Sequence, residues 1–76
     1  MVYEDIKNYF IANNKLKFKL YSLEYMIEQK DNYIEIYAVY YENRKKQYNS
    51  FDELMNSFTV YNEPLISQIN RIQIIN

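Results

Sequence analysis

Histidine, cysteine and glycine are all absent from this chain of 76 residues, although they often carry enzyme and metal chemistry. Thiolate zinc sites, cysteine nucleophiles, histidine-based triads and disulfides need the first two residue types. Glycine-rich loops that cradle phosphates need the third. Chemistry is left to carboxylates, serines, lysines and tyrosines, and their spacing decides what each can do.

The carboxylates are scattered, and the only adjacent acidic pairs are Glu4–Asp5 and Asp52–Glu53. Both pairs lie where the pattern predicts the first turn of a helix, so the helix dipole explains them without a metal. Glu24, Glu28 and Glu35 would converge on one sheet face, and paired carboxylates can hydrolyse glycosides. However, so short a chain offers no deep cleft in which to bury a catalytic acid. We therefore expect neither a metal nor a cofactor.

Nucleophilic catalysis would require a hydroxyl group that acts without a histidine base. The candidates are Ser22, Ser50, Ser57, Ser67 and Thr59. Helix capping already explains Ser50, and no serine has a recognisable spacing to a lysine. We expect no catalytic residue, and hence no enzyme.

Basic residues form two clusters that could contact nucleic acid. They are Lys15, Lys17 and Lys19 along one predicted strand, and Arg44, Lys45 and Lys46 at a predicted turn. The abundant tyrosines could stack on bases. Against this, ten acidic residues outnumber nine basic ones, and alternating lysines also protect an edge strand from aggregation. Weak binding to single-stranded nucleic acid or a ribonucleoprotein is therefore the alternative function.

Hydrophobic periodicity predicts the helices that frame these residues. Val2, Ile6 and Phe10 recur at helical spacing, which predicts a helix over 2–13 ended by a left-handed Asn13 or Asn14. Ser50 and Glu53 fit a capping box, which predicts a short helix over 51–58.

A last helix is expected to follow an Asn62 cap, with Pro64 tolerated in its first turn. Its buried residues would be Leu65, Ile66, Ile69 and Ile72. The tail Ile74–Ile75 either extends this helix or forms an extended edge segment.

A period of two predicts strands in the middle of the chain. Residues 15–28 alternate, with a phase slip between Leu20 and Tyr21 that favours a bulge; two shorter strands with a break would serve equally. A turn over 29–32 leads to a second strand over 33–42, and a third strand covers 46–49.

The spacing of like charges guides the expected register of the hairpin at this turn. A two-residue loop at Asp31–Asn32 would place Glu28 opposite Glu35, which is unfavourable. We therefore expect a four-residue loop that pairs Ile27 with Ile34.

The order of elements predicts one small α+β domain over residues 1–76. It has an N-terminal helix, a three-stranded antiparallel meander and two short C-terminal helices. Alternation sends Tyr37, Val39 and Tyr41 to the face opposite Ile36, with Met26 beside them. Tyrosine and methionine with few charges are typical of interface centres. Alternatively, the last helix folds across this face.

We therefore expect a non-enzymatic protein–protein interaction module that forms a homodimer, or binds another protein, through Met26, Tyr37, Val39 and Tyr41. The first residues are too charged for a signal peptide, and no apolar run is long enough to span a membrane. Ten asparagines, ten isoleucines and ten tyrosines without a glycine indicate an AT-rich genome. The expected origin is bacterial and the expected compartment is the cytoplasm.

Overall fold

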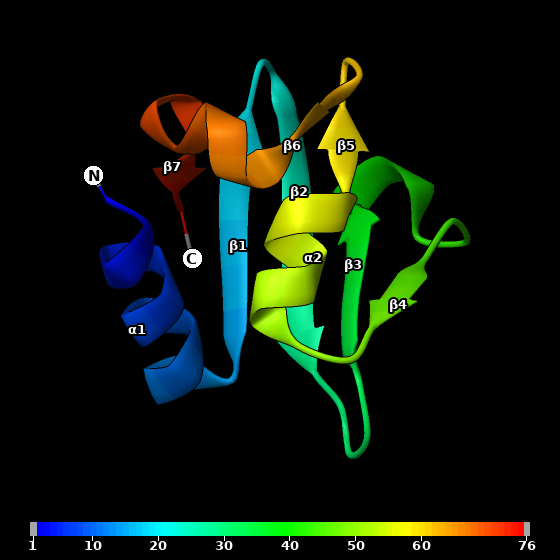
Figure 1. Cartoon of the computed structure of the whole chain (residues 1–76). Coiled ribbons are helices and arrows are strands. Elements are labelled where there is room, and N and C mark those ends of the chain that lie inside the picture. Colours follow the sequence, from blue (N-terminus) through cyan, green and yellow to red (C-terminus); the bar gives the residue numbers. More distant parts are fainter. Residues whose placement is uncertain (1, 76) are drawn as a thin grey trace.

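The computed structural model describes residues 2–75 and places its helices on one side of an antiparallel sheet (Figure 1). The helical segments are α1 (Tyr3–Asn13), α2 (Phe51–Ser57) and two 3-10 segments, η1 (Val39–Tyr41) and η2 (Leu65–Arg71). The strands are β1 (Lys15–Leu20), β2 (Leu23–Gln29), β3 (Ile34–Ala38), β4 (Lys46–Tyr48), β5 (Thr59–Val60), β6 (Glu63–Pro64) and β7 (Gln73–Ile74).

Five of the strands form one sheet in the order β4-β3-β2-β1-β7, and β5 and β6 form a separate two-stranded hairpin. The predicted α+β class and N-terminal helix are confirmed. The predicted three-stranded meander is wrong, because residues 15–28 form two strands and β7 joins the edge of the sheet beside β1. The tail that could have extended the last helix therefore becomes an edge strand.

The phase slip at Leu20 marks a tight turn and not the expected bulge. Leu20 pairs directly with Leu23, so Tyr21 and Ser22 alone reverse the chain between β1 and β2. Both turn residues have positive φ angles, 59° for Tyr21 and 127° for Ser22, which match a tight hairpin turn but are costly without glycine.

The β2–β3 register is the one that charge repulsion was expected to exclude. Glu28 pairs with Glu35 and Ile27 with Ile36, and a two-residue loop at Asp31–Asn32 joins the strands. Lysines offset the repulsion, because Lys30 lies 3.6 Å from Glu28 and Lys45 lies 3.3 Å from Glu35. Both lysines lie outside the two strands, so the spacing of charges within the strands does not reveal them.

The second predicted strand ends earlier than expected. β3 stops at Ala38, and Val39 and Tyr41 belong to η1, so they do not continue the strand alternation. The third strand and the capped helix are close to their predicted ranges. The Ser50 Oγ accepts a hydrogen bond from the Glu53 amide at 3.0 Å, and the Glu53 carboxylate reaches back to the Asn49 amide at 3.1 Å.

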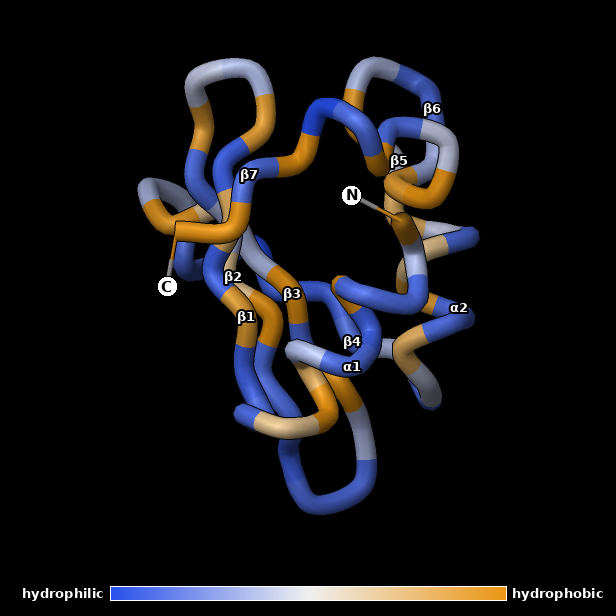
Figure 2. Tube along the Cα trace, turned by 90° about the vertical axis from the view of Figure 1, so that its left-hand side faces the viewer, coloured by the Kyte–Doolittle hydropathy of each residue, from blue (hydrophilic) through white to orange (hydrophobic). Residues whose placement is uncertain are grey.

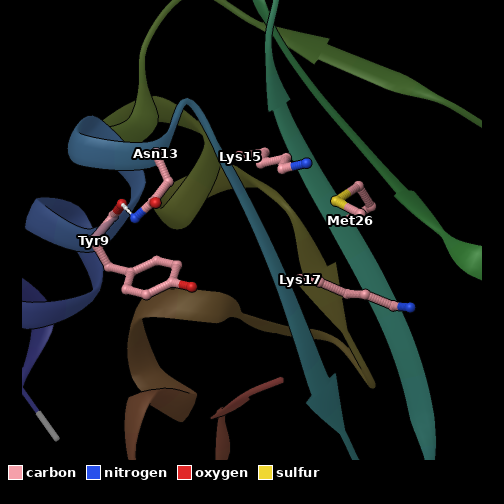
Figure 3. Close-up of a pocket in the computed structure, with 5 residues that line it drawn as sticks. All are labelled: Tyr9, Asn13, Lys15, Lys17 and Met26. Carbon is pink, nitrogen blue, oxygen red and sulfur yellow. Dashed lines mark hydrogen bonds between the residues drawn. The ribbon is translucent and has the colours of Figure 1, made fainter. Parts of the chain in front are cut away.

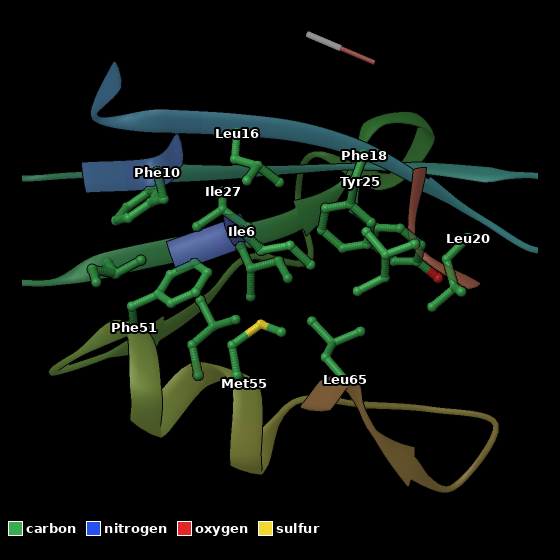
Figure 4. Close-up of a cluster of buried hydrophobic side chains, with 14 residues drawn as sticks. Ile6, Phe10, Leu16, Phe18, Leu20, Tyr25, Ile27, Phe51, Met55 and Leu65 are labelled. Atoms are coloured by element: carbon green, nitrogen blue, oxygen red, sulfur yellow. The ribbon is translucent and has the colours of Figure 1, made fainter. Parts of the chain in front are cut away.

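One hydrophobic core fills the space between the sheet and the helices (Figure 4). Hydropathy alternates along β1 and β3 (Figure 2), and in β2 the buried residues are Tyr25 and Ile27, so each strand has one row of side chains facing the core. The buried apolar residues are Ile6, Phe10, Leu16, Phe18, Leu20, Tyr25, Ile27, Ile34, Ile36, Phe51, Leu54, Met55, Leu65 and Ile72. Phe51 stacks on Phe10 with ring centroids 4.9 Å apart, which joins α2 to α1.

The segment after α2 differs most from the expected last helix. Tyr61 and Asn62 form the β5–β6 turn with φ angles of 55° and 65°, so Asn62 is a turn residue and not a helix cap. Leu65 and Ile72 are buried as expected, whereas Ile66 and Ile69 are half-buried. Gln68, which no apolar pattern marks, is 1% exposed.

Candidate protein interface

The side of the sheet opposite the core, here called the outer face, carries a regular pattern of side chains. The pairing registers arrange it in three rows across β1, β2 and β3. The central row is Lys17, Met26 and Tyr37; on one side lie Lys15, Glu28 and Glu35, and on the other Lys19 and Glu24. The buried apolar residues of α1, α2 and η2 all belong to the core on the other side. The outer face is therefore a lysine column beside a glutamate column with a small apolar centre.

Ion pairs within the chain hold several charged side chains of the outer face. The Lys17 ammonium lies 3.4 Å from Glu24 across the β1–β2 pair. Glu35 is 5% exposed and is contacted by Lys45 at 3.3 Å and by Lys30 at 4.0 Å. The hydrogen bond to Glu35 raises the pKa of Lys45. Glu24 and Glu35 are therefore each paired with at least one lysine.

Tyr37 is the aromatic residue at the centre of the outer face, and its ring contacts a lysine of the same chain. The Lys45 ammonium lies 5.0 Å from the centre of its ring, a cation–π distance. Burial raises the pKa of Tyr37, and the neighbouring Glu28 raises it further. The Tyr37 hydroxyl therefore stays neutral at ordinary pH. The contact with Lys45 helps to hold the ring in place.

The structure brings together only two of the four predicted interface residues. Met26 and Tyr37 are direct neighbours across β2 and β3 at the centre of the outer face. The placement expected for Val39 and Tyr41 is wrong, because both lie in η1, beyond the end of β3. Tyr41 is 50% exposed and lies under the Arg44 guanidinium, 5.5 Å from its ring centre.

The two predicted basic clusters do not form one surface. Lys15, Lys17 and Lys19 lie on β1, whereas Arg44, Lys45 and Lys46 lie at or beside β4, with β2 and β3 between them. The strands between them carry the three glutamates. Lys46 lies 5.9 Å from the Phe58 ring centre, and Lys45 is paired with Glu35. A nucleic acid strand crossing from one cluster to the other would therefore pass over negative charge.

A pocket of about 360 Å³ opens where α1 meets the lysine column (Figure 3). Tyr9 and Asn13 line it from α1, Lys15 and Lys17 from β1, and Met26 from β2. The Asn13 amide donates to the Tyr9 carbonyl at 2.8 Å, which fixes this end of the helix. Two ammonium groups beside a tyrosine ring could accept an anionic group attached to an apolar body.

Sequence reasoning missed a polar contact between α1 and α2. The Tyr3 hydroxyl donates to the Asp52 carboxylate, and the Lys7 ammonium lies 3.1 Å from the same group. The hydrogen bond from Tyr3, followed by the contact with Lys7, lowers the pKa of Asp52. Burial, followed by the hydrogen bond to Asp52, raises the pKa of Tyr3. No sequence signal pointed to this contact, because its members are far apart in the chain.

Over residues 2–75 no cluster of three or more potential metal-ligating side chains occurs. Over the same range no helix has both the length and the apolar character needed to cross a membrane. A scan against protein-family models, a search of curated proteins and a search of solved structures each found no match.

Proposed function

We propose that this protein is a non-enzymatic protein–protein interaction module that self-associates through the outer face of its sheet. One observation carries the proposal: the buried apolar residues of the helices lie on the core side of the sheet, α1 meets the outer face at the pocket beside Lys15 and Lys17, and the outer face has Met26 and Tyr37 side by side at its centre. Antiparallel sheets with one solvated face are common, but that face is then usually polar throughout. An aromatic and a methionine at the centre are typical of contact surfaces.

The size of the domain supports self-association. A domain of this length buries a modest fraction of its surface and has a small core. A second layer packed on the outer face would add apolar burial that the single chain lacks. Two-fold pairing of one surface with its own copy is the commonest symmetric assembly.

Sedimentation equilibrium tests the proposal with wild type and Tyr37→Glu. We expect a wild-type dimer and a folded Tyr37→Glu monomer, because the substitution would bury a charge at the centre of the contact. Tyr40→Glu is the matched control, since Tyr40 is 77% exposed and lies in η1, beyond the end of β3. A wild type that stays monomeric at about 100 μM, far above typical specific affinities, overturns the proposal.

A second candidate function is weak binding of single-stranded nucleic acid. The pocket beside Lys15 and Lys17 favours it, because Tyr9 offers a ring for a base close to two ammonium groups. Titration with mixed oligonucleotides at several salt concentrations tests it. Binding that weakens steeply with salt supports this function, and no binding at low salt removes it.

A further inference from the structure

The outer face is charge-complementary to itself in only one of the simple two-fold arrangements. Resting on the proposed self-association, we infer that two copies pack face to face about a two-fold axis that runs parallel to the strands and lies between β1 and β2. β1 of each copy then lies over β2 of the other copy. The two sheets are aligned, as in ordinary sheet-on-sheet packing.

The lysine column and the glutamate column of the outer face determine the direction of the axis. An axis perpendicular to the strands leaves each strand over its own copy, so the lysines of β1 face lysines and the glutamates of β2 face glutamates. Like charges juxtaposed across an interface cost several kcal/mol. An axis parallel to the strands exchanges the columns and avoids this repulsion.

The same columns decide the position of the axis. Placed on β1, a parallel axis opposes lysines; placed on β2, it opposes glutamates. Placed between β2 and β3, it sets Glu28 against the Glu35 of the other copy. Only the position between β1 and β2 sets Lys15 against Glu28 and Lys19 against Glu24, twice each by symmetry.

The central row supports the same axis. The Ile75 amide donates to the Lys17 carbonyl at 2.9 Å, so Ile75 lies level with this row at the far edge of the sheet. Ile74 packs on the core, and alternation therefore sends the 40% exposed Ile75 to the outer face. Rotation about the inferred axis brings Ile75 of one copy over Tyr37 of the other. Met26 then meets the aliphatic stem of Lys17.

The charged residues at the inferred contact are available for pairing. Lys15 and Lys19 form no ion pair with any residue in the range 2–75. Glu24 and Glu28 each have a single lysine partner, at 3.4 Å and 3.6 Å. A second copy would give each glutamate a second cation, and would give the two free lysines a carboxylate.

A charge-exchange experiment tests the axis with two single substitutions, Lys19→Glu and Glu24→Lys. Alone, each variant opposes like charges at two places in the dimer, and we expect association to weaken on the order of a hundredfold. Mixed in equal amounts, the two variants restore opposite charges at both places, and we expect a heterodimer close to wild type in affinity. A chain carrying both substitutions also restores the pairing and is expected to form a homodimer.

Circular dichroism melts of each variant establish that it is folded before its association is measured. Lys15→Glu with Glu28→Lys repeats the test at the other end of the face if either first variant fails to fold. Glu63→Lys reverses an exposed charge on β6, in the separate β5–β6 hairpin, and serves as the matched control. A wild-type monomer overturns the proposed function itself. A wild-type dimer whose single variants still associate, or whose mixture does not, overturns the axis alone.

Discussion

Gln68 is a buried polar residue whose side chain links two parts of the fold by hydrogen bonds. Its replacement by methionine should destabilise the fold. The Tyr21 hydroxyl donates to the Gln68 side-chain oxygen at 2.8 Å. The Gln68 side-chain nitrogen donates to the Val60 and Glu63 carbonyls at 3.0 and 2.9 Å. Gln68 therefore connects the β1–β2 turn to the β5–β6 hairpin. Methionine has a similar volume and removes all three hydrogen bonds without opening a large cavity.

The expected loss in the free energy of unfolding follows from these contacts. Each hydrogen bond contributes about 1 kcal/mol net, so the three together account for about 3 kcal/mol. The Glu63 carbonyl lies in an exposed strand residue and can bind water instead. We therefore expect Gln68→Met to cost about 2 kcal/mol and to lower the melting temperature by roughly 8–16 °C in a domain of this size.

Urea denaturation followed by circular dichroism measures this loss, and a double-mutant cycle isolates one bond. Tyr21→Phe removes a single hydrogen bond and should cost about 1 kcal/mol in the wild type. In the Gln68→Met background the same substitution should cost almost nothing, because its partner is already gone. The interpretation fails if Gln68→Met leaves the midpoint unchanged, or if Tyr21→Phe costs the same in both backgrounds.

Four further predictions concern stability. Ser50→Ala removes the α2 cap and should cost about 1 kcal/mol in urea denaturation, and an unchanged midpoint would contradict the cap. Ile36→Ala empties a fully buried position on β3 and should cost about 2–5 kcal/mol; a loss below about 0.5 kcal/mol would contradict its place in the core. Ser22→Gly relieves a φ of 127° and should raise stability by about 0.5–1 kcal/mol, so a lowered melting temperature would refute the strain. The raised pKa of Tyr3 means that the folded state keeps a proton that the unfolded state loses near pH 10. Stability should therefore be complete below about pH 10 and fall above it, and Tyr3→Phe should weaken this dependence in urea midpoints measured from pH 8 to 11.

Local patterns predicted the elements that depend on local physics. The spacing of Ile6 and Phe10 located α1, and Asn14 ends it with a φ of 59° as its residue type allows. Ser50 and Glu53 located the start of α2, because capping involves neighbouring residues only. The alternation along β1, β2 and β3 identified the core face correctly.

Features that depend on distant residues were not predictable in this way. The β2–β3 register required Lys30 and Lys45, which lie outside the two strands and offset the Glu28–Glu35 repulsion. The last helix was expected from isoleucine spacing, but the β5–β6 hairpin occupies its start and Gln68 takes a core position in η2. A buried glutamine has no hydrophobic signal, because its partners come from Tyr21 and from the hairpin backbone.

The four residues proposed for the interface were placed with mixed success for a similar reason. Met26 and Tyr37 follow from strand alternation and lie where expected. Val39 and Tyr41 do not, because η1 interrupts the alternation after Ala38. No pattern placed Ile75 beside this face, since that placement requires β7 to pair with β1.

The pairing of β7 with β1 also has a consequence for how the chain folds. β1, β2 and β3 are joined by two-residue turns and can associate early, whereas β7 must reach β1 across most of the chain. Closing so long a loop costs on the order of 3–4 kcal/mol in chain entropy, so β7 should dock last and detach first. Until it docks, β1 is an open edge that can accept a strand from another chain. Hydrogen exchange at the Ile75 amide should therefore be the fastest among the bonded sheet amides, and it should slow as protein concentration rises if association holds the edge closed.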